Sequence, residues 1–239
     1  MFKKKKTPNY LQLILIIFAV VFALLLAMAI SFDKPKTENR STFFDDYKKS
    51  PELEQINLIT YVKQNIVTEP TINSNSPILG NPQAKVTIFK FSSYGCPASK
   101  NTQPILKQLL NKYPNEIKIV WKDLPISDLY KEADLAHTAT RCAGEQNKFW
   151  QYQELVWENQ NDLSFDVLKN IAKKIALNMS SFESCIENKE VNNIINNDIK
   201  EAGQLSISGT PHFYINSQEI FGSATLEDFE RLINIELNR

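Results

Sequence analysis

Hydrophobic residues form one long block near the N-terminus and recur in shorter, periodic segments afterwards. The block runs from Leu11 to Ile30, a stretch of 20 residues broken only by Gln12. A helix of that length, at about 1.5 Å per residue, spans the roughly 30 Å hydrocarbon core of a membrane. The pattern therefore predicts a single-pass transmembrane helix, or signal anchor, over residues 11–31.

Four lysines, Lys3 to Lys6, precede this block, and residues 1–10 are expected to form a basic cytoplasmic tail. The positive-inside rule keeps such a tail in the cytoplasm and exports the chain that follows the apolar segment. A cleaved signal peptide is the alternative, because Ala27-Met28-Ala29 fits a cleavage site, although the block is longer than a signal peptide needs. Both interpretations place the body outside the cytoplasm, in the periplasm or at the cell exterior, where disulfides persist.

Residues 32–76 are expected to form a juxtamembrane linker. Within it, the spacing of Leu53, Ile56 and Val62 predicts a helix. Residues 68–82 are rich in Asn, Ser, Pro and Gly, which predicts a loop that leads into the first strand.

Strand and helix patterns alternate from Val86 onward. Val86 to Phe91 and Ile117 to Trp121 are short, mostly apolar runs that predict buried strands. Residues 97–112 between them have helical spacing, and Pro104 is expected to kink that helix.

A long helical stretch follows the second strand. Its apolar positions recur at helical spacing, from Leu129 and Ala133 to Ile199 and Ala202. The last predicted elements are a hairpin turning at Asn216-Ser217 and a helix: His212 to Ile215, Gln218 to Phe221, and a helix from Thr225. This order predicts an α/β, thioredoxin-like fold over residues 77–239, with a helical insertion at about 126–204.

Composition excludes several classes of function. Lysine plus arginine and aspartate plus glutamate number 27 each, so without Lys3 to Lys6 the body is mildly acidic, which argues against a nucleic-acid partner. The two histidines and three widely spaced cysteines form no local zinc-binding pattern. We expect neither a metal nor a cofactor.

Candidate chemistry lies in Tyr94-Gly95-Cys96-Pro97-Ala98-Ser99-Lys100, directly after the first predicted strand. A cysteine at a strand-to-helix junction is typical of a thioredoxin-type redox site, and unpaired N–H groups at the start of a helix favour its thiolate. Pro97 suits the first helical turn because it has no N–H to lose. Ser99 stands where a dithiol enzyme would place its second sulfur, so a disulfide captured by Cys96 has no internal nucleophile to release it.

Residues 80–239 resemble the DsbA family of thiol:disulfide oxidoreductases. The resemblance rests on four segments that occur in order: Gly80-Asn81-Pro82 through Cys96-Pro97, Lys122-Asp123-Leu124-Pro125, Cys142 to Trp150, and Ile207-Ser208-Gly209-Thr210-Pro211 followed by His212 to Asn216. It implies a cis-proline loop at Thr210-Pro211 that packs over the active sulfur and pairs with the substrate backbone. His212, which follows this loop, is a candidate to line the substrate groove.

The chain departs from that family at three positions. Ser99 replaces the second cysteine, Lys90 stands where relatives carry an acidic residue, and Ser93 stands where they carry aspartate. Ser99 alone could be a substitution made to trap a mixed disulfide, but such a change would not alter Lys90 or Ser93, which favours natural divergence. Lys90 either points toward Cys96 and stabilises its thiolate or is a solvated residue at a strand edge.

The resemblance also implies a structural disulfide between Cys142 and Cys185, because some relatives bridge the matching positions. Two separate buried thiols are the alternative. His137, flanked by small residues on a predicted helix, is expected to be a partly exposed structural residue.

These features favour a membrane-anchored, extracytoplasmic thiol–disulfide oxidoreductase or isomerase that forms mixed disulfides through Cys96. Its substrates would be protein thiols and disulfides, and a thiol of a partner protein or of low molecular weight would release them. One alternative is a non-catalytic polypeptide-binding module near Pro211. Another is an iron–sulfur or glutathione site of the monothiol-glutaredoxin type, although the glutathione-pocket signature is missing.

Overall fold

The computed structural model describes residues 68–187 and 189–239. The predicted cytoplasmic tail, the predicted membrane segment and residues 32–67 of the predicted linker lie outside this part of the chain. Among the residues that are described, no helix is both long enough and apolar enough to cross a membrane.

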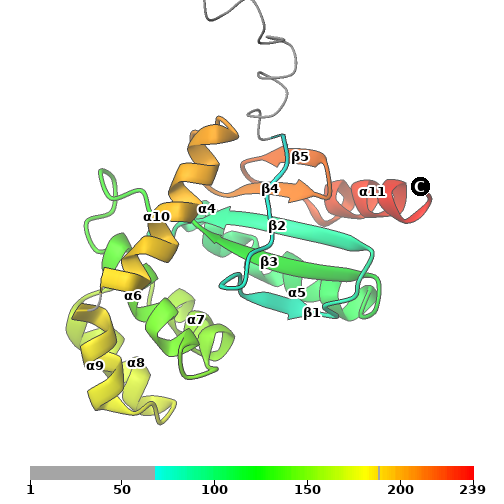
Figure 1. Ribbon diagram of the computed structural model, residues 1–239. Coiled ribbons are helices and arrows are strands. Elements are labelled where there is room, and N and C mark those ends of the chain that lie inside the picture. The colour runs from blue at the N-terminus through cyan, green and yellow to red at the C-terminus, as the bar shows by residue number, and fades with distance from the viewer. Residues whose placement is uncertain (1–67, 188) are drawn as a thin grey trace, which may run out of the picture. The chain divides into compact units, whose positions relative to one another are not determined.

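A five-stranded mixed sheet forms the centre of the fold, with the strand order β1-β3-β2-β4-β5 (Figure 1). β2 and β3 run parallel, and the other neighbouring strands are antiparallel. Every residue of β2 is buried, because helices cover both faces of the sheet at this strand. The strands are β1 (Ile78–Gly80), β2 (Val86–Ser92), β3 (Ile117–Asp123), β4 (His212–Ile215) and β5 (Gln218–Phe221).

Two helices pack on one face of the sheet, and the end of a third packs on the other (Figure 1). α5 (Gln103–Lys112) and α11 (Leu226–Leu237) cover the face that carries Val86 and Ile88. α10 (Lys189–Gln204) lies against the face that carries Phe89 and Phe91. Because side chains alternate along a strand, Lys90 shares the α5 face with Ile88.

Four further helices lie between β3 and β4 in the sequence and build a separate apolar cluster. They are α6 (Ala133–Gly144), α7 (Phe149–Glu158), α8 (Phe165–Lys174) and α9 (Met179–Glu187). A disulfide of 2.13 Å joins Cys142 in α6 to Cys185 in α9. This cluster reaches the sheet through Tyr94 and Trp121, whose rings stack at 5.0 Å.

Three details differ from the sequence-based expectations. β1 was expected to be part of a loop, but it pairs with β3 along one edge of the sheet. The single kinked helix over 97–112 is two helices, α4 (Pro97–Asn101) and α5, with a break at Thr102, because Pro104 has no N–H to donate to Lys100. Leu129 lies in a turn and is 71% exposed, and α6 begins only at Ala133.

The C-terminal elements follow the predicted pattern closely. β4 and β5 form a hairpin with Asn216 in the left-handed region at φ 50°. Thr225 caps α11, since its hydroxyl accepts a hydrogen bond from the Asp228 N–H while the Asp228 carboxylate accepts one from the Thr225 N–H.

Candidate active site around Cys96

Cys96 lies at the carboxyl end of β2, directly before α4, and its side chain is nearly buried, with 7% exposed. Its carbonyl oxygen accepts a hydrogen bond of 3.2 Å from the Lys100 N–H, which closes the first turn of α4. Pro97 is the first helical residue and gives up no hydrogen bond there. The short α4 therefore holds the thiol at the edge of the sheet.

The Cys96 thiol faces the loop that precedes β4. Cys96 Sγ donates a hydrogen bond of 3.2 Å to the carbonyl oxygen of Thr210, 114 residues further along the chain. The peptide bond between Thr210 and Pro211 is cis. The fold thus places the cysteine and the proline loop, two of the segments that carry the family resemblance, in direct contact.

The side chain of Gln160, which belongs to no motif in the sequence, holds the backbone on both sides of Gly95. Gln160 Nε2 donates to the carbonyl oxygens of Tyr94 and Cys96, at 2.7 and 2.9 Å. Gly95 lies so close to Tyr130 that an added Cβ would be 2.3 Å from the Tyr130 Cβ, so this position accepts no side chain without displacing that loop. No local pattern around Gln160 could have indicated this contact.

Ser99 lies in α4 and is completely buried. Its hydroxyl oxygen has no hydrogen-bond partner among the described residues. Its carbonyl oxygen, in contrast, accepts three hydrogen bonds: from Lys90 Nζ at 3.0 Å, Thr102 Oγ1 at 2.7 Å and Gln103 Nε2 at 3.3 Å. A hydroxyl is a far weaker nucleophile than a thiolate, so Ser99 offers no group that can displace a sulfur bound to Cys96.

Lys90 is buried in the middle of β2, with 1% of the residue exposed, so the interpretation as a solvated strand-edge residue is wrong. Its ammonium lies 5.2 Å from the ring centre of Trp157 and 5.8 Å from that of Trp121. Burial lowers the pKa of Lys90 from an ordinary value of 10.5 to about 7, while the nearby Cys96 acts in the opposite direction. The positive charge at this position is therefore poorly compensated.

Pro211 and His212 differ in what they can offer a substrate. Pro211 is part of the loop that contacts the thiol, whereas the His212 side chain is buried between the rings of Tyr214 and Phe221. His212 Nε2 lies 2.8 Å from a carboxylate oxygen of Glu219, and burial lowers the pKa of His212. The expectation that His212 lines the groove fails for its side chain, because that side chain points into the fold.

A shallow cavity of about 280 Å³ lies beside the cis-proline loop. It is lined by residues 124–128, which follow β3, and by residues 207–209, which precede the cis bond. Two large apolar side chains are exposed near this cavity: Leu129, which directly follows residue 128, at 71%, and Phe221 at 66%. The Phe221 ring lies 3.7 Å from the position that a Cβ on Gly209 would take. This surface thus offers apolar contacts beside the cis-proline loop.

A buried cluster of charged residues contacts the backbone just before Cys96. The Asp123 carboxylate accepts hydrogen bonds from His137 Nδ1 at 2.5 Å, Arg141 Nε at 2.5 Å and Trp121 Nε1 at 2.7 Å. The backbone N–H of Tyr94 donates to His137 Nε2 at 3.4 Å, so the imidazole proton is on Nδ1. His137 was expected to be partly exposed; it is fully buried because it links Asp123 to the backbone two residues before Cys96.

Arg141 connects this cluster to α10. Its guanidinium donates to Asp123 and, at 2.8 Å, to Asp198, which also forms an ion pair of 3.2 Å with Lys122. Burial alone would raise the pKa of Asp123, but Arg141 and His137 hold it well below its ordinary value. In the part of the chain that the structure describes, this cluster included, no three His, Cys, Asp or Glu side chains gather in an arrangement that could hold a metal ion.

Comparison with known sequences gives the family. A family model described as Thioredoxin matches residues 72–235. The chain belongs to the thioredoxin family. The matched region of this thioredoxin-family chain contains Cys96, the Thr210–Pro211 loop and the helices between β3 and β4.

Solved structures of other thioredoxin-like proteins share the fold. A thioredoxin-like oxidoreductase from Silicibacter pomeroyi aligns with a TM-score of 0.65 and 23% identity, over 70% of this chain and 95% of that one. The thiol-disulfide exchange protein alpha-DsbA2 from Wolbachia pipientis aligns with a TM-score of 0.63 and 22% identity, over 74% and 92% of the two chains. At these identities the likeness shows the fold.

Curated relatives of this thioredoxin-family chain include a protein named Na(+)/H(+) antiporter NhaA 1 from Salinispora arenicola. The two sequences are 29% identical over 150 residues. The match covers 63% of this chain but 23% of the antiporter, so the chain spans about a quarter of the length of that relative. The similarity is therefore to one segment of the antiporter.

Proposed function

We propose that the chain is a DsbA-like thiol–disulfide exchange protein that acts through the single thiol of Cys96. The observation that carries this proposal is the contact between Cys96 Sγ and the carbonyl oxygen of Thr210 in the cis-proline loop. Of the three cysteines in the chain, Cys142 and Cys185 are bonded to each other, which leaves Cys96 as the free thiol. Protein thiols and disulfides are the substrates.

The exchange proceeds in two steps, each of which forms one disulfide bond and breaks another. The Cys96 thiolate attacks one sulfur of a substrate disulfide, which forms a mixed disulfide and releases the other substrate sulfur as a thiolate. A second thiolate, from a partner protein or from a low-molecular-weight thiol, then attacks the substrate sulfur of the mixed disulfide, forms a disulfide with the substrate and releases the Cys96 thiolate. Because Ser99 takes no part in the second step, the lifetime of the mixed disulfide depends on the external thiol.

Lys90 stabilises the Cys96 thiolate in this mechanism. Its ammonium donates to the carbonyl oxygen of Ser99, three residues after the thiol, and no carboxylate among the described residues lies within ion-pair distance of it. In its protonated form, Lys90 attracts the negative charge that the Cys96 sulfur carries during exchange, and a medium of low dielectric constant strengthens this attraction.

The extended backbone of the substrate docks beside Thr210 and Pro211, in the cavity formed by residues 124–128 and 207–209. The N-terminal apolar block anchors the protein in the cell membrane, with the domain outside the cytoplasm. The bond between Cys142 and Cys185 supports this location, because structural disulfides persist in oxidising compartments.

Non-reducing mass spectrometry tests the proposal directly. The reduced protein is mixed with a peptide whose single cysteine forms a disulfide with 2-thiopyridine, because the pyridine-2-thione released by Cys96 does not attack back, and glutathione is added after the first measurement. The wild-type protein and Ser99→Ala should hold the peptide on Cys96 until glutathione is added, whereas Ser99→Cys should release it without glutathione by forming a bond between positions 96 and 99.

Two outcomes would contradict the proposal. Release from the wild-type protein as fast as from Ser99→Cys would mean that another group resolves the mixed disulfide. Equal retention of the peptide by Cys96→Ala would show non-covalent polypeptide binding, the alternative function of this groove.

A further inference from the structure

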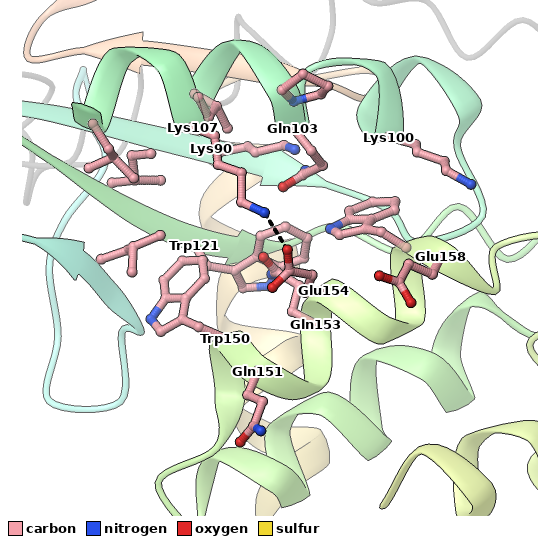
Figure 2. Close-up of a pocket in the computed structure, with 16 residues that line it drawn as sticks. Lys90, Lys100, Gln103, Lys107, Trp121, Trp150, Gln151, Gln153, Glu154 and Glu158 are labelled. Carbon is pink, nitrogen blue, oxygen red and sulfur yellow. Dashed lines mark hydrogen bonds and ion pairs between the residues drawn. The ribbon is translucent and has the colours of Figure 1, made fainter. Parts of the chain in front are cut away.

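A second cavity lies on the α5 side of the sheet and has a volume of about 600 Å³ (Figure 2). Lys90, Gln103 and Lys107 reach it from β2 and α5, while Trp150 and Glu154 reach it from α7. Cys96 does not line this cavity. Its volume lies within the range of about 300 to 1,000 Å³ that is usual for small-molecule sites.

The floor and walls of the cavity combine a buried cation with aromatic surface. Trp121, Trp150 and Trp157 all line it, together with apolar side chains of β1, β3 and α5. Lys90 has three N–H donors, but a single hydrogen bond to it, with Ser99, is formed among the described residues. Burial lowers the pKa of Lys90, which reflects the same lack of a counter-ion.

A second donor in the cavity has no partner at all within the described residues. The indole Nε1 of Trp157 is buried and makes no hydrogen bond. The ring of this residue is centred 5.2 Å from Lys90 Nζ, so the two unsatisfied donors lie in one neighbourhood. Buried polar groups are rarely left unpaired in native proteins, and each such group is costly unless a ligand or water satisfies it.

We propose that this cavity binds a small aromatic carboxylate, whose carboxylate accepts hydrogen bonds from Lys90 Nζ and Trp157 Nε1 while its ring packs against Trp121 and Trp150. A carboxylate supplies the missing negative charge and has two acceptor oxygens for the two donors. The flat, apolar body of such a ligand matches tryptophan surfaces, which favour stacked or edge-on aromatic contacts.

The ligand enters between α5 and α7. The ion pair between Lys107 and Glu154 joins these helices across the mouth of the cavity, as Figure 2 shows, and both side chains are exposed. Exposed ion pairs contribute little to stability, so the mouth opens at a small cost in free energy.

Isothermal titration calorimetry with 2-naphthoate tests the inference on the full-length chain in lipid nanodiscs, with empty nanodiscs as the blank. The titrations use a Cys96→Ala background, so that failure of the thiol chemistry and failure of this site are separate results. Binding to a single site is expected, and Lys90→Met should weaken it at least tenfold, while the affinity for the neutral analogue 2-naphthamide changes less than threefold. Trp157→Phe, which keeps the ring and removes the donor, should weaken 2-naphthoate binding about threefold to tenfold.

A pair of substitutions on α5 separates the cavity from the rest of the surface. Leu110→Trp adds a large side chain to the cavity wall and should abolish binding, whereas Gln108→Trp, on the same helix but outside the lining, should leave it unchanged. The inference is overturned if 2-naphthoate does not bind, if Lys90→Met binds it as tightly as the wild-type protein, or if Leu110→Trp has no effect.

Discussion

Lys90 Nζ donates a hydrogen bond of 3.0 Å to the carbonyl oxygen of Ser99, so a buried ammonium contacts the backbone one helical turn after the reactive thiol. Neither residue presents its charge or hydroxyl group to solvent. We therefore expect Lys90 to influence both the reactivity of Cys96 and the stability of the fold, and the two effects can be measured separately.

Replacing Lys90 by methionine should slow the alkylation of Cys96 by iodoacetamide at pH 7 by about threefold to tenfold, because the thiolate loses a nearby positive charge. Lys100→Met is the matched control, since Lys100 lies on α4, which begins directly after Cys96, but is only half-buried. Quenching the alkylation at several times and measuring the labelled Cys96 peptide by mass spectrometry gives the rate for the wild-type protein and for each variant. Equal slowing in the two variants would mean that net charge, and not the buried position, is responsible.

Lys90 should also make stability depend on pH in the alkaline range. Its pKa falls from 10.5 to about 7 on folding, so between these pH values the unfolded chain binds more protons than the folded one, and stability rises with pH. Methionine does not titrate, so Lys90→Met lacks this contribution to the pH dependence of stability. Its stability advantage over the wild-type protein should be largest near pH 6 and shrink toward pH 10, by at most about 1.4 kcal/mol per pH unit. Urea unfolding of both proteins at several pH values measures the difference, and a constant difference would contradict the prediction.

Removing Arg141 should destabilise the fold strongly. Arg141→Leu leaves the buried carboxylates of Asp123 and Asp198 without the cation that lies between them, at an expected loss of about 3–5 kcal/mol. Arg231→Leu, at an exposed position of α11, should change stability by less than about 0.5 kcal/mol. Urea unfolding compares the two variants, and similar small losses would show that the cluster contributes little.

The disulfide between Cys142 and Cys185 should stabilise the helices that follow β3. It closes a loop over a sequence separation of 43 residues. Replacing both cysteines by serine should lower the free energy of unfolding by about 4 kcal/mol, because the unfolded chain gains the freedom that the bond removes. The measurement is urea unfolding without reductant, with the wild-type protein in reductant as the comparison. Identical stability with and without the bond would contradict the prediction.

Local patterns were enough to predict much of the sheet and the C-terminal half of the domain. Val86 to Phe91 is almost entirely apolar, and the hairpin and the Thr225 cap depend on residues close together in the sequence, so these elements were predicted within a residue or two. β1 was missed because it has three residues and is defined by its pairing with β3, which no local signal records.

The site was predictable in part for the same reason. Cys96 and the Thr210–Pro211 loop carry recognisable motifs, whereas the buried contacts around them involve residues that usually lie on surfaces. His137 and Arg141 were not assigned to the interior because their partner, Asp123, is distant in the sequence. Lys90 could have been placed there, since all its neighbours in β2 are apolar or small and a strand without polar alternation is buried on both faces.

Gln160 gives the helices after β3 a direct connection to the backbone at Cys96. Its side-chain amide donates hydrogen bonds to the backbone on both sides of Gly95. Gln160 follows α7, one of the helices after β3, and the disulfide between Cys142 and Cys185 joins two others, α6 and α9. The backbone at Cys96 thus depends on a side chain 64 residues further along the chain. A substitution that displaces the helices after β3 is therefore expected to change the position of the Cys96 thiol as well.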